Sequence, residues 1–191
     1  MALTATPLTE LDAVNEILGT GSESPVSTLE DNEVIDAALA LKILRVTSAE
    51  VQKVGWWFNE EDNYPLNPDQ TGTIRVPGNT LKVVSPGDDI ILRGLRLYSK
   101  ASRSYTFESP IEVSIVFGLP FEELPASARD YITIRAARKY QDRYIGDDAV
   151  HTYTKQDEQM AMKMLDDEEL ESRPANMLSD SLFMQTLLRR T

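Results

Sequence analysis

Clusters of acidic side chains are the residues of this chain best suited to catalysis. Two carboxylates about 5 to 9.5 Å apart hydrolyse glycosidic bonds, one as general acid and the other as nucleophile or base. Adjacent acids include Glu60-Glu61-Asp62, Asp88-Asp89, Glu122-Glu123, Asp147-Asp148 and Asp166-Asp167-Glu168-Glu169. Because the chain has 31 acidic residues, such clusters also arise as solvated surface, and the sequence singles out no pair. A glycan hydrolase therefore stays an alternative hypothesis.

The chain has few residues of the types that other kinds of catalysis require. The chain has no cysteine and only one histidine, His151, which argues against disulfides, thiolate nucleophiles, zinc sites and histidine-based triads. The segment RGLRLYSK at 93–100 lacks the glycine spacing and the Gly-Lys-Ser/Thr ending of a phosphate-binding loop. We expect no cofactor and no metal.

A basic stripe with interleaved aromatic residues lies in the middle of the chain. It consists of Arg93, Arg96, Lys100 and Arg103, with Tyr98 and Tyr105 between them. Such a stripe can stack on and neutralise a nucleic acid strand, or it can be strand residues that face solvent beside half-buried aromatic rings. The net charge of −12 argues against a sequence-independent grip on nucleic acid, which needs clustered cations.

The composition is that of a folded protein with a packed core. The chain has 191 residues, of which 41% are hydrophobic and 26% charged. No stretch approaches the roughly 20 apolar residues that a membrane span needs. The start, MALTATPLTELDAV, lacks a basic segment followed by an apolar one. We therefore expect neither a secretion signal nor a membrane partner.

Two helices are predicted before residue 59. Thr9 is a plausible N-cap with Asp12 three residues later, and the apolar residues that follow share one helical face until Gly19. A second periodic segment runs from about Asp31 to Val54. The next stretch, from residue 59 to about residue 72, is rich in turn-forming residues and is predicted as a connection.

A small antiparallel sheet is predicted next. Short runs of strand-forming residues occupy 71–76, 80–85, 89–99, 104–108 and 111–118, separated by proline and glycine pairs. In the last run Ile111, Val113, Ile115 and Phe117 alternate on one face. The close spacing favours antiparallel neighbours over crossover connections.

Two further helices of opposite charge are predicted after the sheet. The first follows Pro125 and ends at Gly146, with five basic and two acidic residues from Arg129 to Ile145. The second, from about Asp147 to Glu171, carries nine acidic residues and two lysines. The acidic face is either a solvated surface that partly pairs with the basic helix, or one of two faces that orient neighbouring copies.

Both tryptophans of the chain stand side by side where helix gives way to sheet, in GWWFNEED at 55–62. We expect Trp56 and Phe58 to clamp the second helix against the sheet, because one buried aromatic removes about 150 to 250 Å² from water. Adjacent residues of an extended chain face opposite ways. Trp57 is therefore expected at a subunit contact or on the outer face of the junction.

The last segment, after Pro174, is apolar and carries Arg189 and Arg190 just before the final Thr191. Its candidate binding residues are Met177, Leu178, Leu182, Phe183, Leu187, Leu188, Arg189 and Arg190. A terminal segment of this composition folds back on its own domain or docks on a partner, and docking is favoured here because Pro174 separates it from the preceding helix.

Taken in order, these features resemble a known family, the tail tubular protein A or head-to-tail adaptor of short-tailed bacteriophages. The similar stretches are Leu11-Val14-Asn15-Ile17-Leu18, PVSTLE at 25–30, Gly55-Trp56 with Phe58-Asn59, SPIEVSIV at 109–116, AARKYQDRYIG at 136–146 and NML at 176–178. The resemblance covers nearly the whole chain from about residue 8. Trp57 and Glu23-Ser24-Pro25 depart from the family's pattern.

The resemblance implies an α+β fold, a bundle of about four helices that bears an inserted antiparallel β domain. Its implied boundaries are 1–58 with 119–173 for the bundle, 59–118 for the β domain and 174–191 for a docking arm. It further implies a structural virion protein, not an enzyme, that forms a twelve-membered ring between the capsid portal and the nozzle, tail tubular protein B. Double-stranded DNA would pass through this ring without specific binding, and the chain would be made in the cytoplasm of the host bacterium.

The portal-binding candidates are the tail residues named above. The candidate subunit contacts are Trp57, Arg135, Arg138, Arg143, Asp166 and Glu169, from the junction and the two oppositely charged helices.

Overall fold

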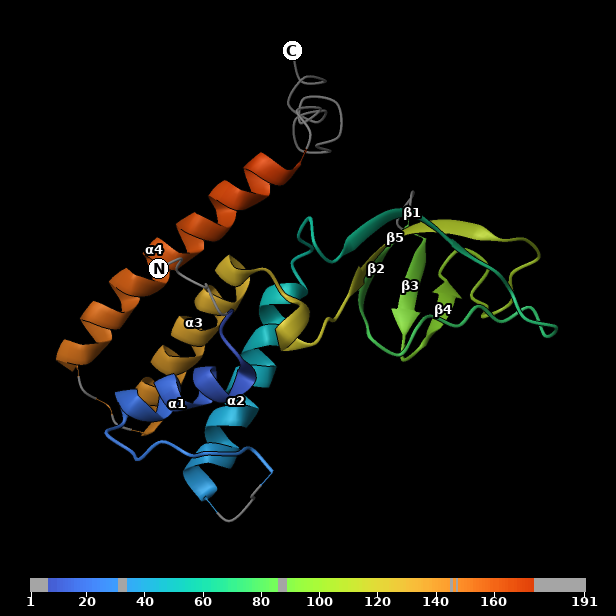
Figure 1. Ribbon diagram of the computed structural model, residues 1–191. Coiled ribbons are helices and arrows are strands. Elements are labelled where there is room, and N and C mark those ends of the chain that lie inside the picture. Colours follow the sequence, from blue (N-terminus) through green and yellow to red (C-terminus); the bar gives the residue numbers. More distant parts are fainter. Residues whose placement is uncertain (1–6, 31–33, 86–88, 145, 147, 174–191) are drawn as a thin grey trace.

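The computed structural model describes residues 7–30, 34–85, 89–144, 146 and 148–173, the last range with side chains from residue 155 onward. Helices gather on one side and strands on the other (Figure 1). Within the described residues the order is two helices, five strands, a short 3₁₀ turn and two helices. The predicted α+β class, with a sheet region inserted between two helix pairs, is confirmed.

The helical part is built around α3 (Ala126–Tyr144), which packs against α1 (Glu10–Thr20), α2 (Ile35–Gln52) and α4 (Asp148–Ser172). Their apolar faces form one cluster of buried residues, including Leu44, Ile132 and Leu165 with no exposed surface. None of the described helices is both long and apolar enough to cross a membrane.

The start of α1 is the predicted one. The Thr9 side chain accepts a hydrogen bond from the Asp12 backbone N–H, and the Asp12 carboxylate accepts one from the Thr9 N–H, both at 3.1 Å. This capping box satisfies two amide donors that the helix itself leaves unpaired. The hydrogen bonds with Thr9 also hold the pKa of Asp12 below its usual value.

Arg129 joins the start of α3 to two other segments. Its guanidinium donates to the carbonyl oxygens of Leu124, Leu8 and Glu122 at 2.8, 2.9 and 2.7 Å. Glu122 belongs to the 3₁₀ turn η1 (Phe121–Glu123). An arginine that serves three carbonyls has little left to offer a partner.

Two small sheets make up the β part. One is antiparallel in the order β1-β5-β2, with β1 (Glu60–Leu66), β5 (Ile111–Phe117) and β2 (Thr80–Val84). The other is the hairpin of β3 (Ile90–Arg93) and β4 (Arg96–Ser99). The predicted alternation in the last strand is seen, since Val113 and Ile115 are buried and Ile111 and Phe117 pack against their cluster.

Two predictions for this part are wrong. Residues 60–66 form strand β1, not a connection, because β1 is an edge strand: Pro65 needs no ladder donor there, and Asn63, with φ of 54°, lies at an irregularity in the register. Conversely, the runs 71–76 and 104–108 are not strands. They make only isolated bridges such as Thr73 to Thr106.

A buried polar network joins the two parts. Asn59, which is 3% exposed, accepts a hydrogen bond from the Trp56 N–H at 2.9 Å through its side-chain oxygen. Its amide nitrogen donates to the Gln52 and Phe117 carbonyls at 3.0 and 2.7 Å. The Gln52 side chain in turn bonds both the N–H and the carbonyl of Leu119. The end of α2 is therefore hydrogen-bonded to the residue just before β1 and to residues at the end of β5.

The strands enclose a second cluster of buried residues, separate from the helical one, with Ile74, Leu97 and Ile115 at its centre. The predicted domain boundaries at residues 58 and 118 stay a prediction, and the proposed arm at 174–191 lies outside the described residues.

Candidate interaction surfaces

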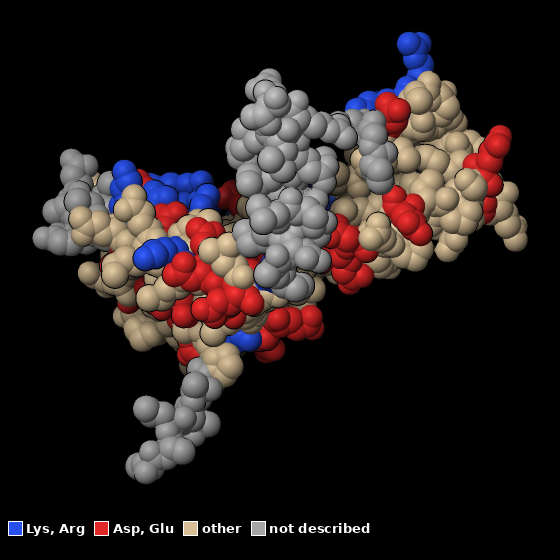
Figure 2. Space-filling view, turned by 90° about the horizontal axis from the view of Figure 1, so that it is seen from above, with Lys and Arg blue, Asp and Glu red and all other residues tan. Residues whose placement is uncertain are grey.

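On the face drawn in Figure 2, acidic side chains are numerous around the middle of the molecule, and basic side chains form smaller groups beside them. Within the described residues no three histidine, cysteine or carboxylate side chains come together as metal ligands. The candidate sites are therefore surfaces and grooves, which are considered in turn.

Trp56 is buried in the core, as predicted. This residue is 4% exposed, and its indole N–H donates to the Val51 carbonyl at 2.8 Å. The Phe58 ring is parallel to it, with ring centroids 6.5 Å apart. Trp57 is half-buried, meets Phe58 edge-on at 4.9 Å and packs against the helical cluster. Whether Trp57 also touches a neighbouring subunit stays a prediction.

The end of α4 is tied to this junction. The Trp57 N–H donates to the Glu169 carboxylate at 2.9 Å. Arg173 pairs with Glu169 one helical turn away and with Glu60, the first residue of β1, at 3.0 Å. Of the predicted contact residues, Trp57 and Glu169 are thus brought together, and the carboxylate of Glu169 is used within the chain.

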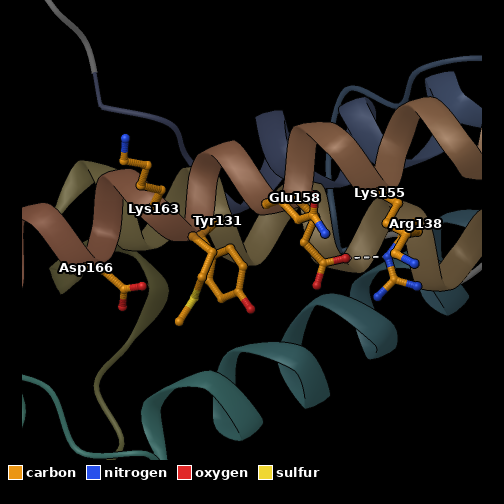
Figure 3. A pocket seen from close by; sticks show the side chains of 8 residues that line it. Tyr131, Arg138, Lys155, Glu158, Lys163 and Asp166 are labelled. Atoms are coloured by element: carbon orange, nitrogen blue, oxygen red, sulfur yellow. Dashed lines mark hydrogen bonds and ion pairs between the residues drawn. The ribbon is translucent and has the colours of Figure 1, made fainter.

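A charged groove lies between α3 and α4. Figure 3 shows Arg138 and Glu158 turned toward each other across it. Arg138 also pairs with Asp142 at 3.1 Å, and Arg135 approaches Glu158 at 3.6 Å. The hydrogen bond that Arg138 donates to the Glu158 carboxylate holds the pKa of Arg138 above its usual value. The groove has a volume of about 450 Å³ and is also lined by Asp166.

The structure therefore brings three predicted contact residues, Arg135, Arg138 and Asp166, to one region, while Arg143 lies with α2 residues at another shallow pocket. Much of the basic charge of α3 is neutralised inside the chain, since Lys139 pairs with Glu50 as well. Glu158, which anchors this region, was not predicted as a site residue. Its position 20 residues from Arg138 gives no signal in sequence spacing.

An acidic groove with apolar walls lies between α1, α3 and α4. Its acids are Glu16, Asp130 and Asp157, and Met160 and Met164 form part of its wall, in a volume of about 610 Å³. Burial, and then the nearby charge of Asp130, raise the pKa of Glu16, and burial raises the pKa of Asp130. Sequence reasoning missed this set because three separate helices contribute one acid each.

The basic stripe of the sequence occupies the β3–β4 hairpin. The Arg93 guanidinium lies 3.7 Å from the centroid of the Tyr98 ring, and that of Arg96 lies 4.7 Å from Tyr105. Lys100 is exposed at the opposite end of the hairpin. The interpretation as solvent-facing cations beside half-buried rings describes these side chains correctly.

The apolar tail, with Met177, Leu178, Leu182, Phe183, Leu187, Leu188, Arg189 and Arg190, lies outside the described residues. His151 is in α4, in the segment whose side chains are not described.

Comparison with known proteins gives matches along most of the chain. A family model described as "Tail tubular protein" matches residues 11–175. A protein named tail tubular protein A, from Klebsiella phage KP34, is 30% identical over 159 residues, which cover 82% of this chain and 84% of that protein. The residues that the family model matches include α2, α3, α4, both sheets and all but the first residue of α1.

Proposed function

We propose, from the premise that this chain belongs to the tail tubular protein family and is a structural component of a phage tail, that it is a ring-forming adaptor. In this role twelve copies link the capsid portal to the tail nozzle and surround part of the path along which DNA is ejected. The match to the family over both the helical and the β part is the observation that carries this proposal.

The charge of the chain supports a passage that does not hold DNA. At −12 per copy, a ring of such subunits is strongly negative, and phosphates in transit meet repulsion instead of a counterion-releasing grip. The acidic side chains of α4 contribute most to this charge among the described elements. A duplex is thereby kept from sticking to the wall.

The apolar segment after Pro174 supports attachment to the portal. Its leucine and methionine residues, with Arg189 and Arg190 near the end, suit a hydrophobic groove with an acidic rim on a partner. The segment begins directly after Arg173, which the ion pairs with Glu60 and Glu169 hold against the junction. The arm would thus leave the subunit from a fixed point.

Binding to the portal protein tests the proposal. The full chain and a chain that ends at Pro174 are each mixed with the portal of the same phage, and complexes are sized by sedimentation and native mass spectrometry. We expect a ring-shaped complex with the full chain and at least a tenfold loss of affinity with the shortened one. Virions made without this protein that still join heads to tails would refute the adaptor role.

One observation favours a second candidate function, hydrolysis of a surface glycan. Glu16 and Asp130 line the same groove, and both have a raised pKa, as a general acid requires. Polysaccharide from the host envelope is incubated with the protein and with Glu16→Gln and Asp130→Asn variants. Turnover that is abolished in both variants would establish this function, and turnover that persists in both would remove this groove from consideration.

A further inference from the structure

Three arginines are direct neighbours in the β part, two across a hairpin and one through an isolated bridge. Arg93 is paired with Arg96 across the β3–β4 hairpin, and Arg96 is bridged to Arg75 on its other side. Residues directly opposite on antiparallel strands project from the same face with their Cβ atoms about 5 Å apart. All three side chains are exposed. Arg75, Arg93 and Arg96 are called the arginine row below.

The arginine row costs the isolated chain stability. Like charges directly opposite each other on a sheet repel, and none of the three pairs with a carboxylate among the residues that the structure describes. Stacking on Tyr98 and Tyr105 holds two of the guanidinium groups in place. Alongside larger contributions from hydrogen bonds to its carboxylate, the charge of Arg75 contributes to lowering the pKa of Asp69. By contrast, Arg93 and Arg96 form an ordered cationic surface with no ion pair among the described residues.

The row has an apolar residue at its tip. Leu95 stands in the turn between Arg93 and Arg96 and is 48% exposed. The two tyrosine rings beside the row are covered by guanidinium groups, so they are poorly placed to stack on nucleic acid bases. A protein surface with an apolar centre and acidic flanks fits this tip better than a nucleic acid strand does.

Helix α4 carries such a surface. Asp157, Met160, Met164, Asp167 and Glu171 follow one another at steps of three and four residues, which places them on one face of the helix. All five are exposed, and Met160 and Met164 are 63% and 65% exposed. The three acids form no ion pair with a cation in the described part of the chain. These five residues are called the α4 stripe.

We propose that the hairpin tip, with Leu95 and the arginine row, binds the α4 stripe of a second copy of this chain. Leu95 packs against the two methionines, and the arginines pair with the acids on either side of them. This inference rests on the proposed function, since it names the contact between adjacent subunits of the ring.

The contact joins copies head to tail. The hairpin and α4 lie on opposite sides of the molecule (Figure 1), so each copy keeps one free tip and one free stripe after it has bound a neighbour. Contacts between two different surfaces repeat from copy to copy, and they form a ring where the rotation between neighbours closes. The basic residues of α3 are less suited to this role, because Arg138 and Lys139 already pair within the chain.

Charge reversal tests the contact in the full-length protein. One variant carries Arg93→Glu and Arg96→Glu, and a second carries Asp167→Lys and Glu171→Lys. We expect each variant alone to self-associate at least tenfold more weakly than the natural chain in sedimentation at low salt. A mixture of the two restores association, because the reversed tip of one then fits the reversed stripe of the other. Lys100→Glu with Arg103→Glu, which changes the net charge by the same amount at the far end of the hairpin, leaves association unchanged.

Disulfide trapping detects the contact even where association is weak. The natural chain has no cysteine, so single cysteines report one site each. Leu95→Cys chains are mixed with Met164→Cys chains that carry a distinguishable mass, and mild oxidation is applied. We expect the mixed disulfide at least fivefold more often than in a control mixture of Leu95→Cys with Val46→Cys, an α2 position that is 49% exposed.

The outcomes separate this inference from the adaptor role. If the mixed disulfide is no more frequent than in the control, the tip does not bind the stripe, whatever the portal assay shows. If the reversed-tip variant instead loses measurable binding to duplex DNA while subunits still associate, the row serves phosphates and the inference is wrong. If each charge-reversal variant, tested alone, still forms a ring on the portal, the proposed contact is wrong while the adaptor role stays intact.

Discussion

Replacing Asn59 by alanine tests the idea that a single buried amide fastens the helical part to the sheets. The side chain bonds three backbone groups, the Trp56 N–H and the carbonyls of Gln52 and Phe117. At 3% exposure, water cannot replace it without a rearrangement. Alanine at this position would leave all three groups without this partner.

The expected loss of stability depends on which hydrogen bonds each of the three backbone groups keeps. The Trp56 N–H loses its bond to Asn59, and a buried unsatisfied donor costs about 1 to 3 kcal/mol. The Gln52 carbonyl keeps the Gly55 N–H at 3.2 Å, so it and the Phe117 carbonyl each lose a net hydrogen bond of about 1 kcal/mol. We expect a loss of about 3 to 5 kcal/mol in the free energy of unfolding. This corresponds to about 10 °C in melting temperature for a chain of this length.

Urea unfolding followed by tryptophan fluorescence measures this loss, because both tryptophans adjoin Asn59. Circular dichroism at 222 nm is recorded in parallel to check that both probes report one transition. Asn79→Ala is the matched control: its amide donates to the Gly118 carbonyl at 3.2 Å from an exposed position, and its loss should cost under about 0.5 kcal/mol. An Asn59→Ala protein within about 1 kcal/mol of the natural chain would refute the fastening role.

Three further predictions concern other parts of the fold. Trp57→Ala removes a half-buried ring from the helical cluster and should lower the free energy of unfolding by about 1 to 2 kcal/mol; unchanged urea midpoint and unchanged ring assembly would contradict its predicted place. Gly72→Ala places a Cβ 2.6 Å from a Thr106 methyl carbon at a φ of 77° and should lower the free energy of unfolding by about 2 to 4 kcal/mol. Gly94→Ala has a φ of 62° but open space around the new Cβ, so it should lower it by about 1 kcal/mol. Thermal unfolding that ranks the two variants in reverse would be evidence against this geometry. For Glu16, burial and Asp130 raise the pKa of the folded state, so the folded chain binds more protons and this residue's contribution to stability falls as pH rises from its ordinary pKa through the raised one. Glu16→Gln should therefore be more stable than the natural chain at pH 7, with the difference vanishing near pH 4, as measured by urea unfolding across that range.

The helices were accessible from the sequence because their signals are local. Thr9 and Asp12 cap α1 within one turn, and Gly55, with φ of 95°, marks the chain reversal after α2. The burial of Trp56 followed from size and from its position at the junction. Such features depend on residues a few positions apart, which a single sequence displays directly.

Strand β1 was missed because its sequence carries the chemistry of a turn. Asn63 and Pro65 are poor strand residues, yet an edge position with an irregular register accepts both. The runs at 71–76 and 104–108 have strand composition, but only isolated bridges form between them. Pairing across long sequence separation decided both cases, and local propensity does not report it.

The candidate surfaces also include some that the local sequence reveals and some that it does not. Arg93 and Tyr98 were visible as a pair because they lie on one hairpin. By contrast, the bridge between Arg75 and Arg96, and the groove shared by Glu16 and Asp130, arise from the tertiary arrangement alone.

The ion pairs of Arg173 have a mechanical consequence. Glu60 begins β1 and Glu169 also holds the backbone of Trp57, so the chain's exit from α4 is clamped where the β part starts. The last turn of α4 is thereby coupled directly to the first residue of the sheet, through side chains that do not pass through the interior of the bundle.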